Sequence, residues 1–188
     1  MEVTLADTAA LLAWIEAGGQ PSYLFFWGHT AASGLVVDKS CLSQWYLAPF
    51  EADGALYRSA EHYMMAHKAL LFGDQAAYRA MLTAATPAQV KALGRQVRGF
   101  DEALWQTARV DIVLAANLAK FSQHPRLARF LLSSAGQVLV EASPVDPVWG
   151  VGLAATDPAI MSPARWIGLN LLGFALMRVR ARLAETAP

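Results

Sequence analysis

The sequence predicts a mainly α protein of the α+β class, with a few short strands in the N-terminal third and one more strand near 137–141. Its 188 residues suit a compact single domain. From Ser59 onward, capping residues and apolar spacings typical of helices recur along the chain. Between Tyr23 and Tyr57, aromatic and β-branched residues are interrupted by glycine and proline, a pattern typical of short strands and turns.

The predicted elements follow in order. An amphipathic segment at 5–17, closed by Gly18-Gly19, predicts a packing helix within an N-terminal lead-in of residues 1–22. Residues 23–57 predict two to four short strands, and Asp53-Gly54 predicts a hairpin turn. Residues suited to helix starts predict helices over 59–72, 74–85, 86–99, 101–122 and 125–132. After the strand at 137–141, residues 143–162 predict a long loop, and Ser162-Pro163 predicts a last helix to about Leu183.

The charge balance and the apolar content exclude some classes of protein. Basic and acidic residues number 15 each, while hydrophobic residues make up 55% and charged residues 16%, against about 25% charged residues in an average soluble domain. A disordered chain is excluded, and a general nucleic-acid binder is disfavoured because it needs a basic surface. The excess of apolar residues predicts a large core, a pocket or a subunit interface such as that of a homodimer.

Cysteine content and the apolar segments bear on the compartment. The single cysteine, Cys41, excludes an internal disulfide and a cysteine-built zinc site. The N-terminus is acidic and lacks the basic and apolar regions of a signal peptide. The longest apolar stretch, Trp166 to Met177, is about twelve residues, whereas a membrane-spanning helix needs about twenty. We therefore expect a soluble cytoplasmic protein with no membrane partner.

The predicted helix 59–72 carries two opposite charges on an apolar face. Glu61 and Lys68 are seven positions apart, which is two helical turns and about 10 Å along one face. A carboxylate and an ammonium on such a face are costly unless they line a pocket or pair with another group. The alternative is a solvated face, with Tyr63, Ala66 and Leu70 turned toward the core.

The predicted helix 101–122 repeats this pattern. Trp105, Arg109 and Lys120 recur at helical spacing, and Asn117 flanks the same side. Arginine and lysine on a face shared with apolar residues are suited to bind a phosphate or a carboxylate. The alternative is a solvated edge, along which the aliphatic stems lie while the charged ends reach water.

The predicted loop concentrates residues suited to ligand binding. Asp146 lies between two prolines, Trp149 offers a ring that can stack on a planar base, and Gly150 permits close approach of a ligand. The alternative is a proline-rich turn whose tryptophan fills the core.

Several common catalytic motifs are absent from the sequence. It has no phosphate-binding P-loop, no dinucleotide glycine motif and no Gly-x-Ser-x-Gly elbow. His62 and His67 point to different faces of their predicted helix, so they form a poor metal pair. We expect no metal and no cofactor. The remaining carboxylates, cations and aromatic residues fit acid–base hydrolysis of a glycosidic bond.

Seven ordered segments resemble one known family, the YbiA-like or NADAR family. They are FFWGH (25–29), CLSQWYLAPF (41–50), YRSAEHYMMAHKALLFGD (57–74), KALGRQVRGFD (91–101), NLAKFSQHPRL (117–127), VLVEASPVDPVWGVGL (138–153) and GLNLLGFALMRVR (168–180). They include the family's EHY…KA helix, its KF segment, its SPxDxxWGxG loop and its GxNxLGxxLMxVR helix. Gln44 departs from an asparagine of the family pattern, and His67 stands where acidic or amide residues are frequent.

The resemblance implies a compact helical fold and a metal-independent N-glycosidase domain over 23–188. Matching the family's motifs to this chain implies two catalytic carboxylates, Asp146 and Glu61, and a set of substrate-binding residues: Lys68, Trp149, Gly150, Trp27, Gly28, Trp45 and Asn170. Arg109 and Lys120 join this set because of their spacing on the long helix.

Three functions are open at this point. The first is a hydrolase that cleaves early riboflavin-pathway intermediates, in which an aminopyrimidine carries ribose 5-phosphate. Asp146 is then the general base near C1 and Glu61 the second acid–base group, although these two roles are interchangeable on the sequence alone. The second is an ADP-ribosyl hydrolase acting on guanine, which makes nucleic acid a partner only as a modified-base substrate. The third is a helical ligand-binding domain without catalysis.

Overall fold

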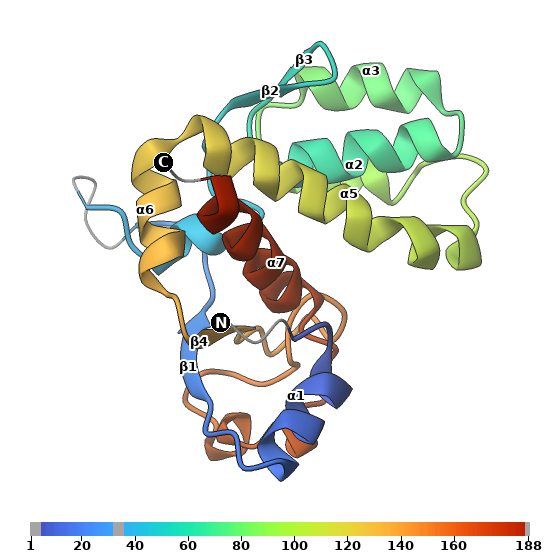
Figure 1. Cartoon of the computed structure of the whole chain (residues 1–188). Coiled ribbons are helices and arrows are strands. Elements are labelled where there is room, and N and C mark those ends of the chain that lie inside the picture. The colour runs from blue at the N-terminus through green and yellow to red at the C-terminus, as the bar shows by residue number, and fades with distance from the viewer. Residues whose placement is uncertain (1–4, 32–35, 187–188) are drawn as a thin grey trace. The chain divides into compact units, whose positions relative to one another are not determined.

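The computed structural model describes residues 5–31 and 36–186. The predicted segments 1–22 and 23–188 also include residues 1–4, 32–35 and 187–188, which lie outside the described residues. The chain forms two compact units (Figure 1). We call Gln44–Pro125 the helical unit. The described residues up to Ser43, together with those from Arg126 onward, form the strand unit. The mainly helical α+β class is confirmed.

The helical unit begins with a β-hairpin. Its elements are β2 (Phe50–Ala52), β3 (Ala55–Tyr57), α2 (Ala60–Leu71), α3 (Gln75–Thr83), α4 (Pro87–Gly94) and α5 (Glu102–Gln123). Strands β2 and β3 pair antiparallel. Their turn places Asp53 at φ 51° and Gly54 at φ 75°, as a two-residue hairpin turn with the twist of the strands requires. The predicted hairpin is confirmed.

Helix α2 is the centre of the helical unit, where it contacts α3, α4 and α5. Its first seven residues, from Ala60 to Ala66, are all buried. Glu61 is only 3% exposed, so the alternative of a solvated charged face on this helix is wrong at that position. Helices buried on all sides usually carry apolar residues around their whole circumference, and the buried carboxylate of Glu61 departs from that pattern.

The predicted helix starts are confirmed by side-chain caps. Asp74 Oδ1 accepts a hydrogen bond from Ala77 N at 3.2 Å, and Asp101 Oδ1 accepts one from Leu104 N at 2.7 Å. Thr86 and Gln89 form the predicted capping box. These bonds satisfy N–H groups that have no partner within the helix.

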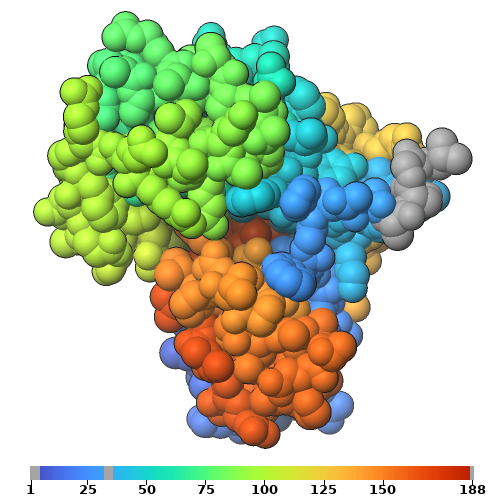
Figure 2. Space-filling model, turned by 180° about the vertical axis from the view of Figure 1, so that it is seen from behind, coloured from blue at the N-terminus to red at the C-terminus, as the bar shows by residue number. Residues whose placement is uncertain are grey.

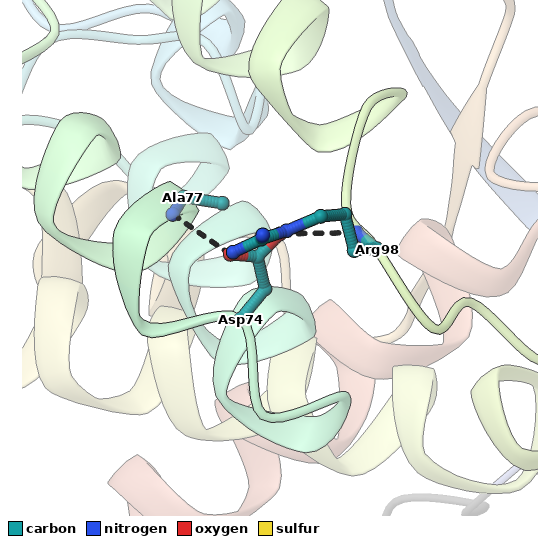
Figure 3. Close-up of polar contacts among 3 residues, drawn as sticks. All are labelled: Asp74, Ala77 and Arg98. Carbon is teal, nitrogen blue, oxygen red and sulfur yellow. Dashed lines mark hydrogen bonds and ion pairs between the residues drawn. The ribbon is translucent and has the colours of Figure 1, made fainter.

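One predicted helix ends early, because α4 stops at Gly94 and not near Gly99. The segment that follows is held by Asp74 (Figure 3). Asp74 Oδ2 accepts hydrogen bonds from Arg98 N at 3.0 Å and Arg98 Nε at 3.2 Å, and Asp74 Oδ1 accepts one from Arg98 Nη2 at 2.8 Å. Since the Arg98 N–H points to this carboxylate, it cannot continue the helical ladder. We call this contact the Asp74–Arg98 clamp.

The strand unit is built on a parallel pair of strands. Its elements are α1 (Thr8–Glu16), β1 (Ser22–Phe26), η1 (Lys39–Leu42), α6 (Pro125–Ser133), β4 (Gln137–Glu141), η2 (Pro158–Met161), η3 (Pro163–Arg165) and α7 (Leu171–Thr186), where η marks a 3₁₀ helix and α6 starts on the last residue of the helical unit. Strands β1 and β4 pair from Ser22–Gln137 to Phe26–Glu141, and α7 lies against β4 (Figure 1).

The predicted last helix is wrong at its start. Ser162-Pro163 opens only the short η3, and α7 begins at Leu171. Residues 167–170 bond instead to the loop before them: Ile167 N donates to Val151 O at 3.0 Å, and Leu169 N to Pro147 O at 2.9 Å. Asn170 then adopts a left-handed conformation, at φ 52°. The predicted loop also contains η2, and its atoms (orange) form much of the visible surface of the strand unit in Figure 2.

Across residues 5–31 and 36–186, none of the helices combines the length and the apolar character that crossing a bilayer requires.

Candidate functional site

The predicted site residues divide between the two units. The helical unit holds one carboxylate, three cations and an indole: Glu61, Lys68, Arg109, Lys120 and Trp45. The strand unit holds the other carboxylate with two indoles, two glycines and an amide: Asp146, Trp27, Trp149, Gly28, Gly150 and Asn170. In the helical unit, α2 carries Glu61 and Lys68, and the helix it contacts, α5, carries Arg109 and Lys120.

Glu61 and Lys120 are deeply buried. Glu61 is 3% exposed, and Lys120 is fully buried. The Lys120 Nζ lies 5.5 Å from the ring centre of Tyr46 and 5.0 Å from that of Phe121. Removing charged groups from water costs free energy that other interactions must offset, and aromatic ring faces attract a cation. The alternative of a solvated edge on α5 is therefore wrong for Lys120.

Arg109 lies on α5, the helix that also carries Lys120, and is half-buried. Its Nε is buried and has no hydrogen-bond partner among the described residues. A guanidinium N–H without a partner is suited to donate a hydrogen bond to an oxygen atom of a ligand. Arg109 thus keeps hydrogen-bonding capacity that the described fold does not use.

A buried amide network holds the segment next to Glu61. Gln44 O accepts a hydrogen bond from Glu61 N at 2.9 Å, and Gln44 Oε1 accepts one from Asn117 Nδ2 at 2.7 Å. The same Asn117 Nδ2 reaches Val113 O at 2.9 Å. Sequence reasoning noted Gln44 only as a departure from the family pattern and Asn117 only as a flanking residue. Their pairing links residues 73 positions apart, and no local pattern could have predicted it.

Lys68 is held between a carbonyl and aromatic rings. Its Nζ donates to Gly94 O at 2.9 Å and lies 4.1 Å from the ring centre of Phe100 and 5.6 Å from that of Trp105. Burial lowers the pKa of Lys68, and the carboxylate of Glu102 partly opposes this change. A second cation lies over the predicted indole, since Lys91 Nζ is 5.6 Å from the ring of Trp45.

The two histidines of α2 have different surroundings. His62 Nδ1 lies 2.8 Å from Ser59 Oγ and its Nε2 lies 3.2 Å from Ala84 O, so both ring nitrogens have partners within the fold. His67 stacks on Tyr63 with ring centres 3.8 Å apart, and its Nε2 lies 3.4 Å from Asp53 Oδ2. His67 therefore faces the β2–β3 hairpin. Within residues 5–31 and 36–186, no three His, Cys, Asp or Glu side chains gather closely enough to ligate one metal ion.

In the strand unit, Trp27 and Gly28 follow the carboxyl end of β1. Trp27 is 57% exposed, and Gly28 has φ 84°, a conformation that favours glycine. The last pair of the two strands joins Phe26 to Glu141. Because parallel strands end at the same edge, the 27–28 segment and the start of the 142–152 loop leave the pair together. Ligands of parallel sheets commonly bind at this edge.

Asp146 organises the turn that presents Trp149. Its Oδ1 accepts hydrogen bonds from Val148 N and Trp149 N, both at 2.9 Å. Gly150 is needed because a Cβ there would lie 2.8 Å from Glu141 O. Trp149 is half-buried. The carboxylate therefore has a structural role through Oδ1, while its Oδ2 lies outside these two bonds.

Asn170 completes the free edge of β4. Its Oδ1 accepts a hydrogen bond from Glu141 N at 3.0 Å, and its Nδ2 donates to Leu139 O at 2.9 Å. The side chain is fully buried. Asn170 thus bonds to β4 as a neighbouring strand would, and its contact with substrate stays a prediction.

The NADAR domain model matches residues 25–184. The chain belongs to the NADAR family. It is 40% identical to the N-glycosidase R617 of Acanthamoeba polyphaga mimivirus over 163 residues, which cover 84% of this chain and 94% of the viral protein. It is 35% identical to the chloroplastic riboflavin biosynthesis protein PYRR of Zea mays over 137 residues, which cover 69% of this chain and 20% of the maize protein.

A solved structure supports the same relationship. The NMR structure of Escherichia coli YbiA superimposes with a TM-score of 0.71 at 26% identity, covering 89% of this chain and 88% of YbiA. The family and its relatives named as N-glycosidases place the NADAR chain among the hydrolases that act on N-glycosyl compounds.

Proposed function

We propose that this N-glycosidase cleaves an aminopyrimidine from ribose 5-phosphate, the chemistry of early riboflavin-pathway intermediates. The observation that carries the proposal is the burial of Glu61 and Lys120 on two helices in contact, α2 and α5. Burying a charged group costs free energy, and charged groups that are buried despite this cost are typical of catalytic and ligand-binding sites. The similarity to a maize protein named for riboflavin biosynthesis supports this substrate class.

The reaction needs a carboxylate at the sugar. The water oxygen attacks C1 while the C1–N bond breaks, its electron pair goes to the base nitrogen, and the departing base takes up a proton. A carboxylate that accepts the proton of the water and faces the positive charge at C1 lowers the barrier. We assign this role to Asp146, through the Oδ2 that its turn leaves outside the bonds to Val148 and Trp149. Glu61 is the second acid–base group.

The cations suit a phosphorylated substrate. The Lys68 ammonium uses one N–H on Gly94 O, and an ammonium has three donors. Arg109 Nε has no partner among the described residues. We propose that Lys68, Arg109 and Lys120 bind the phosphate and that an indole stacks on the base, the candidates being Trp27, Trp45 and Trp149.

A mass-spectrometric turnover assay tests the substrate. Purified chain is incubated with the aminopyrimidine ribose 5-phosphate and, separately, with a guanine-ADP-ribosylated oligonucleotide. We expect free base and ribose 5-phosphate from the first. Release of ADP-ribose from the second substrate alone would establish the alternative hydrolase. Saturable binding with the ligand recovered unchanged would establish the ligand-binding domain.

Two substitutions separate the roles of Asp146. Asp146→Ala removes both the turn acceptor and the charge, whereas Asp146→Asn keeps an oxygen for Val148 N and Trp149 N and removes the charge alone. If Asp146 is the general base, both variants lose at least about a hundredfold in kcat. An Asp146→Asn enzyme with normal turnover would exclude the assignment and leave Glu61 as the base. The homodimer and the cytoplasmic location stay predictions.

A further inference from the structure

An exposed aromatic ring covers the Lys68 ammonium. Phe100 is 43% exposed, and its ring centre lies 4.1 Å from Lys68 Nζ. We propose that Phe100 is a positioning residue that aims the Lys68 ammonium at the phosphate of the substrate. This inference rests on the phosphate-binding role of Lys68 in the proposed function and deepens it.

The contacts around Lys68 restrict the position of its ammonium group. Gly94 O accepts one N–H at 2.9 Å. The face of the Phe100 ring attracts the cation on another side, and Trp105 lies farther away at 5.6 Å. An ammonium has three N–H donors in tetrahedral geometry. With one N–H on a carbonyl and a ring on another side, the remaining N–H is the donor left for a ligand oxygen.

The backbone on either side of Phe100 is anchored. Two residues earlier, the Asp74–Arg98 clamp holds the chain against the start of α3 (Figure 3). One residue later, Asp101 caps α5 through Leu104 N at 2.7 Å. Gly99 between them has φ 71°, a turn that favours glycine. Polar contacts on both sides of Phe100 therefore hold its backbone in place, although its side chain is exposed and is not anchored by burial in the core.

The ring itself is also supported. Phe72 meets Phe100 edge to face, with ring centres 5.3 Å apart at 66°. Phe72 is the C-terminal cap residue of α2, the helix that carries Lys68. The ring and the ammonium are therefore fixed by the same helix end. Preorganised contacts of this kind lower the ordering cost of ligand binding.

The test compares three variants. Phe100→Leu keeps an apolar side chain and removes the aromatic face, and Phe100→Tyr keeps the face. Leu56→Ala is the matched control, because Leu56 is an exposed apolar residue of β3 in the same unit. Binding of ribose 5-phosphate is measured by calorimetry, with ribose as the uncharged reference. The Lys68 ε-methylene signal is followed by NMR, since it reports the ammonium without catalysis.

We expect Phe100→Leu to weaken ribose 5-phosphate binding about two- to fivefold and to leave ribose unaffected, as loss of one partly exposed cation–π contact predicts. Its Lys68 signal should move. Phe100→Tyr and Leu56→Ala should match the wild type. Equal binding and an unmoved signal in Phe100→Leu would overturn the proposal, and so would a loss in Phe100→Tyr as large as in Phe100→Leu.

A fourth variant distinguishes failure of this inference from failure of the proposed function. If Lys68→Met binds ribose 5-phosphate like the wild type, Lys68 is not a phosphate ligand and the positioning role falls. Turnover of the aminopyrimidine ribotide by the wild-type enzyme still decides the proposed function separately. Circular dichroism of each variant verifies that it is folded.

Discussion

Replacing Asn170 by alanine tests whether this residue serves the fold. The change removes two hydrogen bonds and leaves Glu141 N and Leu139 O of β4 without these partners. An orphaned buried polar group costs about 1–2 kcal/mol, so the two together cost about 2–4 kcal/mol. Alanine at φ 52° adds about 1 kcal/mol of backbone strain. We expect a total loss of about 3–5 kcal/mol, a large part of the stability of a typical domain.

Urea denaturation followed by circular dichroism measures this loss. Asn170→Gly is the matched variant, because it loses the same two bonds but tolerates the positive φ, and it should be less destabilised than Asn170→Ala by about 1 kcal/mol. A wild-type urea midpoint for Asn170→Ala would refute the role of the side chain in completing β4. If both variants kept full stability but lost kcat/KM, Asn170 would act on the substrate, as the family resemblance implies.

Two further predictions concern pH. Hydrogen bonds from Arg98 hold the pKa of Asp74 well below its usual range. The clamp therefore stabilises the fold fully above about pH 4, and this contribution falls progressively at lower pH. Asp74→Asn should be less stable than the wild type at pH 7, and the difference between their urea midpoints should narrow as the pH is lowered from about 5 to about 3. Burial lowers the pKa of His62. Below about pH 6.5 the histidine is protonated in the unfolded chain but stays neutral in the folded one, so the free energy of unfolding decreases as the pH falls below this value. His62→Gln should show a flatter thermal-melting profile between pH 7 and pH 5, and an unchanged slope would contradict the assignment.

The helix starts and the hairpin could be predicted from the sequence because their causes are local. Ser59, Asp74 and Asp101 each cap N–H groups within three residues, and Asp53-Gly54 sets the turn by its own backbone preference. These elements can be predicted without knowledge of any contact between residues distant in the sequence.

The errors lie where distant contacts decide. Helix α4 ends early because Asp74 binds Arg98 across 24 positions. Helix α7 starts late because residues 167–170 bond to the 147–151 loop. Neither interaction can be recognised in the local sequence pattern, and the same is true of the parallel pairing of β1 with β4.

The candidate site shows the same division. Residue types suited to the chemistry could be recognised, among them Glu61, Lys68 and Asp146. The second role of Asp146 as a turn acceptor and the ring above Lys68 depend on three-dimensional contacts that the sequence pattern does not indicate. Phe100 reads in the sequence as an ordinary apolar residue before a helix cap, so no signal distinguished it.

The parallel strand pair also has a consequence for how the chain is made. Strands β1 and β4 are more than a hundred residues apart in sequence, and the whole helical unit lies between them. At a synthesis rate of about 5–20 residues per second, β1 waits on the order of ten seconds for its partner. All residues of the helical unit are synthesised during that time, before the second part of the strand unit. Closing so long a loop of unfolded chain costs about 4 kcal/mol of entropy, and a helical unit that folds first removes most of it. If the inserted helical unit folds before β4 is synthesised, less unfolded chain separates β1 from β4, and their pairing costs less entropy.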